Sequence, residues 1–184
     1  MQVAAVILAA GASTRFGSPK QLARIGELTM LETVIGLAGR AGLVPIVVVV
    51  PPGLPVPPGA IPAVNDRPME GISRSIRMGL AAVPPQIEAA VILLGDEPAL
   101  SPDAIAAVLA AARPGLAVVA ARAGDRVGPP VLLRRGRFDL AGLAHGDEGL
   151  ASVLRGLPDL VTVPLADVPV DIDTPEDLAR LTAG

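Results

Sequence analysis

The loop from Ala9 to Lys20 combines small residues with two cations, Arg15 and Lys20. Small residues let the backbone approach a ligand closely, and exposed N–H groups can form a concave anion-binding surface. The glycine content alone favours a flexible loop with solvated cations. The position of the loop after the apolar run from Val3 to Ala9, together with both cations, instead favours a triphosphate site. The loop contains neither a Walker A motif nor the Gly-x-Gly-x-x-Gly dinucleotide fingerprint.

Acidic residues follow two later segments that are expected to be extended. Asp96 comes two residues after the apolar run from Ala89 to Leu94. Hard cations such as Mg²⁺ prefer carboxylate and phosphate oxygens together, so Asp96 is the first metal ligand that we expect. Taken alone, a role for Asp96 in the following turn is an equally good explanation. Asp171 and Asp173 are spaced to face the same side of an extended segment. The alternative for Asp173 is a role in the cap of the next helix, although Thr174 already serves that purpose.

The elements that would position these residues alternate between strand and helix. Continuous apolar runs, as in Val3 to Ala9, are typical of strands buried on both faces, and Thr29 is a plausible N-cap for the first helix. The segment from Ala123 to Pro130 is interpreted as a turn, followed by a short return strand from Val131 to Leu133. The further expected strands are 44–50, 61–64, 89–94, 116–122 and 160–163, and the expected helices are 30–41, 73–82, 101–112 and a last one after Thr174-Pro175. This alternation predicts one Rossmann-like, doubly wound, mostly parallel α/β domain over residues 1–184, with ligands at the carboxyl ends of the strands.

Composition excludes several classes of function. The 184 residues include no cysteine, tryptophan or tyrosine and one histidine, His145, which excludes thiolate sites, a multi-histidine zinc site and a base-stacking surface. A net charge of -3 predicts no strong attraction to nucleic acid or to an anionic membrane. No apolar run reaches the roughly 18 residues of a membrane helix, and the first residues lack the basic start of a signal peptide. We therefore expect a cytoplasmic protein. His145 is interpreted as a loop residue rather than an acid–base catalyst.

Four segments follow one another along the chain and combine these features. They are Leu8-Ala9-Ala10-Gly11 with Arg15-Phe16-Gly17 and Lys20, then Gly71-Ile72-Ser73-Arg74-Ser75-Ile76-Arg77-Met78-Gly79-Leu80, then Leu94-Gly95-Asp96-Glu97-Pro98, and last Asp171-Ile172-Asp173-Thr174-Pro175-Glu176-Asp177-Leu178. In this order the segments resemble the motifs of nucleotidyltransferases of the molybdenum-cofactor type. One match alone would be weak, but four in order, over essentially the whole chain, are specific.

The form of three segments indicates a branch of this family. Ala9-Ala10-Gly11 resembles the cytidylyl enzymes more than the guanylyl enzymes, which tend to carry glycines there. The segments Gly146-Asp147-Glu148-Gly149 and Gly128-Pro129-Pro130-Val131 also resemble the cytidylyl branch. The second departs from it at Pro129, where a polar residue is often found, and this departure concerns the acceptor rather than the nucleotide chemistry.

The resemblance implies a glycosyltransferase-A-like fold and a specific reaction. An acceptor phosphate, expected to be that of molybdopterin, attacks the α-phosphorus of an NTP, expected to be CTP, and pyrophosphate leaves. The family pattern implies that Mg²⁺ is held by Asp96 and Asp173, and that Arg15 and Lys20 are the catalytic residues that stabilise the triphosphate. The expected nucleotide-binding residues are Ala9, Ala10, Gly11, Arg15, Lys20, Ser73 and Ser75.

Several alternatives stay open at this point. Guanylyl transfer to the same cofactor, or nucleotidyl transfer to another small phosphate, would use the same residues. A different class is a nucleotide-binding or molybdoenzyme-maturation protein without transferase activity, and a molybdoenzyme or its chaperone is a further candidate partner. Ser73 has local capping of its helix as an equal alternative. The basic cluster Arg134, Arg135 and Arg137 is expected to be solvated, with a role for one of them in binding an anionic pterin phosphate as the alternative.

Overall fold

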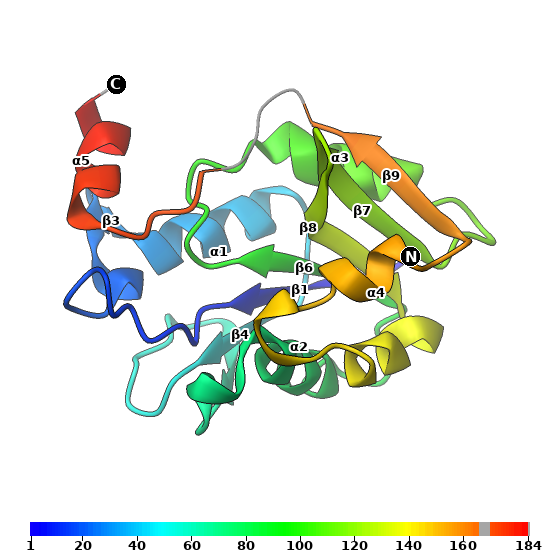
Figure 1. Cartoon of the computed structure of the whole chain (residues 1–184), viewed down its shortest axis with the longest axis horizontal. Helices are drawn as coiled ribbons and strands as arrows, with labels where there is room; N and C mark the ends of the chain where they lie inside the picture. Colours follow the sequence, from blue (N-terminus) through cyan, green and yellow to red (C-terminus); the bar gives the residue numbers. More distant parts are fainter. Residues whose placement is uncertain (166–169, 184) are drawn as a thin grey trace.

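The computed structural model describes residues 1–165 and 170–183 and contains a seven-stranded sheet (Figure 1). The strand order is β5-β4-β1-β6-β8-β7-β9, and β8 runs antiparallel to both of its neighbours whereas the other pairings are parallel. The predicted mostly parallel sheet is therefore confirmed. The strands are β1 Val3–Leu8, β4 Ile46–Val50, β5 Ala60–Val64, β6 Ala89–Leu94, β7 Val118–Ala123, β8 Arg126–Arg134 and β9 Leu160–Pro164, and a separate hairpin pairs β2 Arg24–Ile25 with β3 Leu28–Thr29.

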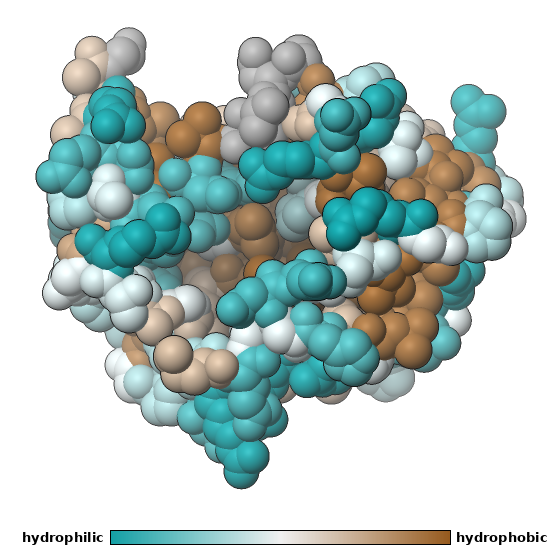
Figure 2. Space-filling view, in the orientation of Figure 1, coloured by the Kyte–Doolittle hydropathy of each residue, from teal (hydrophilic) through white to brown (hydrophobic). Residues whose placement is uncertain are grey.

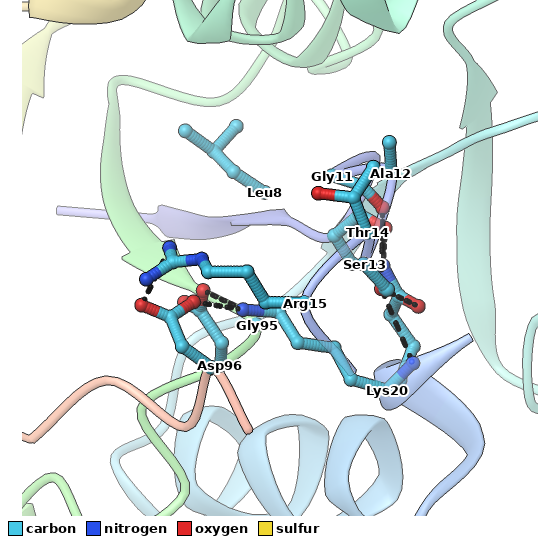
Figure 3. Close-up of a pocket in the computed structure, with 12 residues that line it drawn as sticks. Leu8, Gly11, Ala12, Ser13, Thr14, Arg15, Lys20, Gly95 and Asp96 are labelled. Atoms are coloured by element: carbon cyan, nitrogen blue, oxygen red, sulfur yellow. Dashed lines mark hydrogen bonds and ion pairs between the residues drawn. The ribbon is translucent and has the colours of Figure 1, made fainter. Parts of the chain in front are cut away.

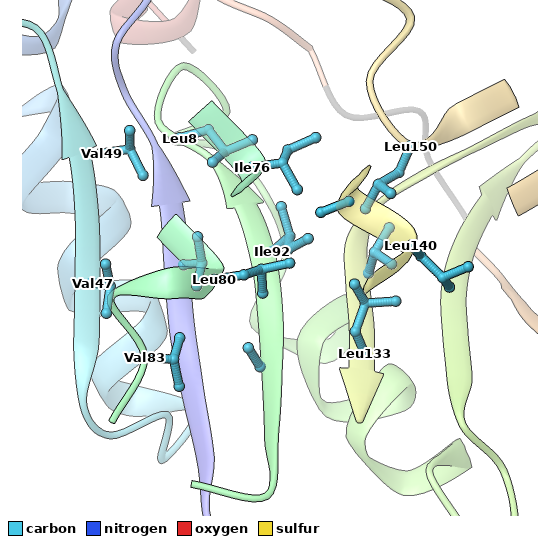
Figure 4. Packing of buried hydrophobic residues seen from close by; sticks show 14 of the residues in the cluster. Leu8, Val47, Val49, Ile76, Leu80, Val83, Ile92, Leu133, Leu140 and Leu150 are labelled. Atoms are coloured by element: carbon cyan, nitrogen blue, oxygen red, sulfur yellow. The ribbon is translucent and has the colours of Figure 1, made fainter. Parts of the chain in front are cut away.

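Helices cover both faces of this sheet. Buried side chains of α2 and α4 belong to one core cluster, part of which is drawn in Figure 4, and those of α1 and α3 belong to a second cluster on the other face. This is the doubly wound arrangement that the sequence predicted. The helices are α1 Met30–Arg40, α2 Ile72–Ala81, α3 Pro102–Ala111, α4 Ala151–Arg155 and α5 Pro175–Ala183, and 3₁₀ turns span Lys20–Leu22, Pro68–Glu70, Arg135–Gly142 and Gly146–Glu148.

Capping residues begin α1 and α3 where the sequence predicted them. The Thr29 hydroxyl accepts a hydrogen bond from the backbone N–H of Glu32, whose carboxylate accepts one from the backbone of Thr29 in return. This capping box satisfies backbone donors that a helix start leaves unpaired. Ser101 caps α3 through its hydroxyl. Among the described residues, no helix is long and apolar enough to cross a bilayer.

The predicted turn from Ala123 to Pro130 is confirmed only at Gly124 and Asp125, because β8 begins at Arg126 and runs for nine residues. A bulge accommodates the two prolines of this strand. Ala120 is paired with Val131 and Ala121 with Gly128, so Pro129 and Pro130 lie between paired residues at the point where the register shifts. Proline has no N–H to donate to a ladder, which explains why the prolines occupy the bulge.

Candidate active site

The carboxyl ends of β1 and β6 place the two most informative segments side by side. These strands are parallel neighbours with Leu8 opposite Leu94, so the loop after β1 and the turn after β6 begin at the same level. The backbone N–H of Gly95 donates to the carbonyl of Leu8 at 2.9 Å. A Cβ atom on Gly95 would lie 2.9 Å from the Cβ of Ala9, so glycine is needed for this close approach.

Four of the predicted residues meet at this edge. The Lys20 ammonium lies 2.7 Å from Asp96 Oδ2 and 2.9 Å from Asp173 Oδ1. Arg15 Nη2 lies 2.8 Å from the other carboxylate oxygen of Asp173. Figure 3 shows the Arg15 and Lys20 side chains converging with Asp96. The side chain of Lys20 is 9% exposed and that of Arg15 is 70% exposed, so Lys20 is the fixed cation of the site and Arg15 is the accessible one.

Electrostatics keep Lys20 and Asp173 charged. Burial alone lowers the pKa of Lys20, but hydrogen bonds and charge attraction from Asp96 and Asp173 outweigh it and raise that pKa above its ordinary value. The hydrogen bond from Lys20 holds the pKa of Asp173 below its ordinary value, with the charges of Lys20 and Arg15 adding to the effect. Lys20 and Asp173 therefore stay ionised at neutral pH.

Asp173 reaches the site because its segment docks against the turn after β6. The backbone N–H of Ile172 donates to the carbonyl of Asp96 at 2.9 Å, and the Ile172 side chain is buried. The start of α5 is capped by Thr174, whose hydroxyl accepts from the N–H of Asp177, while the Asp177 carboxylate accepts from the backbone of Thr174. The capping role was the alternative for Asp173, and these contacts assign it to Thr174 and Asp177.

The side chain of Gln21 holds the loop after β1 in place, and this role was not predicted from the sequence. Its buried side-chain amide donates to the carbonyl of Ala9 at 2.8 Å and to that of Gly11 at 3.0 Å. The hydroxyl of Ser13 in turn accepts from the backbone N–H of Lys20 at 3.2 Å. These contacts fold the loop back on its own end and fix the path of its backbone. The position of Gln21 directly after Lys20 was the one signal available in the sequence.

Three cavities open along this edge, and Leu8 lines all three. The loop cavity has a volume of about 220 Å³ and is lined by Ala9, Gly11, Arg15, Lys20, Asp96 and Asp173, among others. The central cavity has a volume of about 430 Å³ and is lined by Ala10, Gly11, Gly71, Ser75, Asp96 and Asp171, among others. The apolar cavity has a volume of about 290 Å³ and lies between α2, β6, β8 and α4.

The two predicted serines differ in position. Ser75 lines the central cavity, and its hydroxyl accepts a hydrogen bond from the buried side chain of Asn65 at 2.9 Å. Ser73 is buried in the first turn of α2 and lines none of these three cavities. Gly71 occupies the N-cap of α2 and no side-chain hydrogen bond caps this helix, so Ser73 does not have the capping role either. The structure brings Ser75 to the site but not Ser73.

A second acidic pair lies behind Asp96. Burial, reinforced by the nearby charges of Asp171 and Asp96, raises the pKa of Glu97 to about 8. Burial also raises the pKa of Asp171, next to Asp96, while a hydrogen bond with Glu97 opposes that rise. Glu97 Oε2 is the one buried side-chain N or O atom without a hydrogen-bond partner in the described chain. Sequence reasoning missed Glu97 because its adjacency to Asp96 does not reveal its burial.

The basic cluster near residue 135 does not belong to the site. Arg134 and Arg135 donate to backbone carbonyls of other segments, including those of Leu116 and Ile87, and Arg137 pairs with Asp159 at 2.6 Å. Arg134 lies opposite the first residue of β6, at the end of the strand away from Asp96. These three arginines therefore make structural contacts, where solvated side chains were expected, and none of them lines the three cavities described above.

His145 is exposed and does not line any of the three cavities, consistent with an ordinary loop residue.

A mostly parallel α/β sheet with a cation-bearing loop after β1 and carboxylates after β6 is the arrangement of an enzyme that handles nucleoside triphosphates. A family model described as the MobA-like NTP transferase domain matches residues 5–163, and the chain therefore belongs to this family of nucleotidyltransferases. This confirms the molybdenum-cofactor-type family that the motifs indicated. The match ends before Asp171 and Asp173.

One curated relative is similar over most of the chain. A protein of Deinococcus radiodurans, named probable molybdenum cofactor guanylyltransferase, is 36% identical over 132 residues, which cover 72% of this chain and 66% of the relative. The chain thus spans just under two thirds of that protein's length. Because the relative is named for guanylyl transfer, the cytidylyl preference is not confirmed.

Solved structures share the fold over the full length of the chain. The crystal structure of Rv0371c from Mycobacterium tuberculosis H37Rv is 27% identical with a TM-score of 0.86 and covers 100% of this chain and 99% of that one. Its homologue from Mycobacterium sp. strain JC1 is 31% identical with a TM-score of 0.86 and covers 99% and 96%. A further structure of the M. tuberculosis protein, described as a complex with manganese, is 27% identical with a TM-score of 0.81 and covers 100% and 99%.

Proposed function

We propose that the chain transfers CMP from CTP to the phosphate of molybdopterin and releases pyrophosphate. The observation that carries this proposal is the contact of one buried ammonium, Lys20, with two carboxylates, Asp96 and Asp173, beside the loop cavity. The cations at this edge can bind phosphate oxygens, and the carboxylates can bind a divalent metal. A nucleoside triphosphate with its metal brings both. GTP is the second candidate nucleotide, and the name of the D. radiodurans relative favours it.

The residues fit a divalent metal that arrives with its nucleotide. No group of three or more potential metal-ligating side chains occurs in residues 1–165 and 170–183. Mg²⁺ is commonly bound by one or two carboxylates together with substrate phosphates and water, which matches Asp96 and Asp173. When bound, the metal neutralises phosphate charge and polarises the phosphoryl oxygens. Mg²⁺ is the ion that we propose, and the manganese complex of a relative supports a divalent ion of this kind.

The protein side chains supply positioning and charge. Small residues and the fixed backbone of Ala9 to Gly11 let the nucleotide lie close to β1, and Ser75 lies where it can contact the base or sugar. Lys20 and Arg15 donate charge-assisted hydrogen bonds to the triphosphate. An oxygen of the acceptor phosphate bonds to the α-phosphorus, the bond to the bridging oxygen breaks, and pyrophosphate leaves with the electron pair. This step needs no histidine, in agreement with the position of His145.

Two wider features follow from the same proposal. Residues 1–184 act as one catalytic domain, because Asp173 returns from beyond the last strand to the edge formed by β1 and β6. The reaction takes place in the cytoplasm, and the nucleotide form of the cofactor passes to a molybdoenzyme or its chaperone. The net charge of -3 suits a small-molecule enzyme that does not bind nucleic acid.

The test is titration calorimetry of CTP and GTP, each with Mg²⁺, into the wild type, Asp96→Asn and the control Asp139→Asn. Asp139 is exposed in the 3₁₀ turn Arg135–Gly142, away from the site. Binding of one nucleotide that requires Mg²⁺ and weakens at least tenfold in Asp96→Asn, but not in the control, supports the proposal. A preference for GTP moves the enzyme to the guanylyl branch, and binding of neither nucleotide overturns the proposed function. Pyrophosphate release with molybdopterin then tests the acceptor.

A further inference from the structure

The side chain of Asn65 is buried directly after β5 and connects this strand to α2. Its Oδ1 atom accepts hydrogen bonds from the backbone N–H of Arg67 and from Nε of Arg74, both at 3.0 Å. Its Nδ2 atom donates to Ser75 Oγ at 2.9 Å. Because two donors face the oxygen, the amide has one favourable orientation, in which its NH₂ group is directed at Ser75.

Two carboxylates hold Arg74 in the position that this orientation requires. Its Nη2 atom lies 2.7 Å from Asp66 Oδ1, and its Nη1 atom lies 3.2 Å from Glu70 Oε2. The guanidinium group stays protonated in proteins and can only donate hydrogen bonds. Arg74 therefore faces Asn65 as a permanent donor, and the amide cannot reverse without placing its NH₂ group against N–H donors.

The hydroxyl of Ser75 accepts from Asn65 but has no acceptor for its own proton among the described residues. Hydroxyl groups in other helices of this chain behave differently, because those of Thr33 and Thr182 donate to backbone carbonyls of the preceding turn. Ser75 is 6% exposed, and a buried donor without an acceptor costs free energy. The free proton of Ser75 therefore indicates a ligand that carries an acceptor atom.

Ser75 lines the central cavity, which adjoins the loop cavity. Gly11, Ala12 and Thr14 line both cavities, so a triphosphate in the loop cavity can place its nucleoside in the central one. Figure 2 shows that this face of the molecule is hollowed, with hydrophobic residues at the floor of the hollow and hydrophilic residues around it. Asn65 lines neither cavity, so it can act on the nucleoside only through Ser75.

We propose that Asn65 is a positioning residue for nucleotide binding: its NH₂ group occupies the acceptor side of the Ser75 hydroxyl, which then donates its proton to an acceptor atom of the nucleoside. This inference rests on the proposed function, because it concerns the same nucleotide. A carbonyl oxygen or an unprotonated ring nitrogen of the base suits this donor best, since it brings no proton that needs a further partner. A sugar hydroxyl is the other source of an acceptor.

The experiment is a double-mutant cycle in which calorimetry measures the affinity for CTP with Mg²⁺, or for GTP if GTP is the nucleotide that binds. The variants are Asn65→Asp, Ser75→Ala and the combination of both. Asn65→Asp keeps the oxygen that Arg67 and Arg74 need but replaces the NH₂ donor by an acceptor, so Ser75 donates to the new carboxylate instead of the nucleotide. We expect each single variant to bind about tenfold more weakly. In the Ser75→Ala background, Asn65→Asp should change the affinity by no more than about threefold.

Three controls accompany the cycle. Ser73→Ala removes a buried hydroxyl of the same helix that lines none of the three cavities, and its nucleotide affinity should stay within about threefold of the wild type. Inorganic triphosphate with Mg²⁺ probes the loop cavity without a nucleoside, so all variants should bind it equally. The third control is the dideoxynucleotide, which lacks both sugar hydroxyls. A loss in Ser75→Ala that persists with it supports a base atom as the acceptor, and a loss that disappears supports a sugar hydroxyl.

Two results overturn the role of Asn65. The first is wild-type affinity in Asn65→Asp. The second is an equal loss with and without Ser75, which would show that the substitution acts through its charge or through the fold. Absence of binding of both nucleotides to the wild type is a different result, because it overturns the proposed function itself.

Discussion

The ammonium group of Lys20 lies 2.7 Å from the carboxylate of Asp96, although 76 residues separate them in the chain. It also lies 2.9 Å from Asp173, so a protein cation sits between the two carboxylates proposed to hold the metal. A metal bound as proposed would therefore compete with Lys20 for the same oxygens until phosphate groups provide Lys20 with other partners.

Replacing Lys20 should therefore strengthen metal binding in the absence of nucleotide. In Lys20→Met the carboxylates lose a neighbouring positive charge, and we expect affinity for Mn²⁺ to rise about tenfold at low ionic strength. Pyrophosphate release should fall at least about 100-fold in the same variant, because one charge-stabilising donor is lost. Paramagnetic resonance titration with Mn²⁺ checks the first effect. Unchanged or weaker Mn²⁺ binding would show that Lys20 does not occupy the metal position.

Gln21 should matter for both stability and nucleotide affinity. Gln21→Leu leaves the carbonyls of Ala9 and Gly11 without the donors they have now, which should cost about 1–3 kcal/mol of unfolding free energy. NTP affinity should fall as well, because the loop backbone is no longer fixed. Urea unfolding and nucleotide titration measure the two effects. Gln86→Leu, at an exposed glutamine, is the matched control and should stay within about 0.5 kcal/mol of the wild type.

Two glycines in helices should respond in opposite directions to the same substitution. A Cβ on Gly79 would lie 2.4 Å from Val6 Cγ1 and 2.9 Å from Val49 Cγ2, where α2 packs on the sheet. Gly79→Ala should therefore destabilise the fold by about 1–3 kcal/mol through overpacking. A Cβ on Gly39 in α1 meets nothing within 4 Å, so Gly39→Ala should stabilise it by about 0.5–1 kcal/mol. Thermal unfolding distinguishes the pair, and equal shifts would contradict the packing of α2.

Glu97 should give the stability a specific pH dependence. Its pKa is raised to about 8 in the folded chain, against an ordinary value of 4.5, so between these pH values the folded state retains a proton that the unfolded state releases. Stability is thus lost as pH rises through this window, by at most about 1.4 kcal/mol per pH unit from this group. Glu97→Gln should decline less between pH 5 and 8 in urea unfolding. Parallel curves for the two proteins would refute the raised pKa.

The sequence predicted many of the strands and helices, because the signals for them lie within short stretches of the chain. Apolar runs that match β1 and β6 identify strands buried on both faces, and Thr29 and Ser101 identify helix starts through bonds to residues two or three positions away. The convergence of Lys20 with Asp96 was also predictable, because neighbouring parallel strands end at the same edge.

The sequence did not reveal the surroundings of several residues, because these surroundings depend on contacts between distant segments. In the sequence, Glu97 cannot be distinguished from an exposed acid in a turn, and only the packing around it shows that it is buried. Arg134 and Arg135 look like a free basic cluster, but carbonyls from other segments accept their hydrogen bonds. The prolines of β8 resembled a turn because the bulge that accommodates them is defined by the pairing of β7 with β8.

The contact of the apolar cavity and the loop cavity through Leu8 alone also has an evolutionary consequence. Substitutions in β8 and α4 can reshape the apolar cavity without altering the loop that follows β1. Sequence drift in that wall can therefore change what the apolar cavity accommodates, while the loop after β1 remains under separate selection. Grafting that wall between relatives should accordingly alter this cavity and leave the loop after β1 intact.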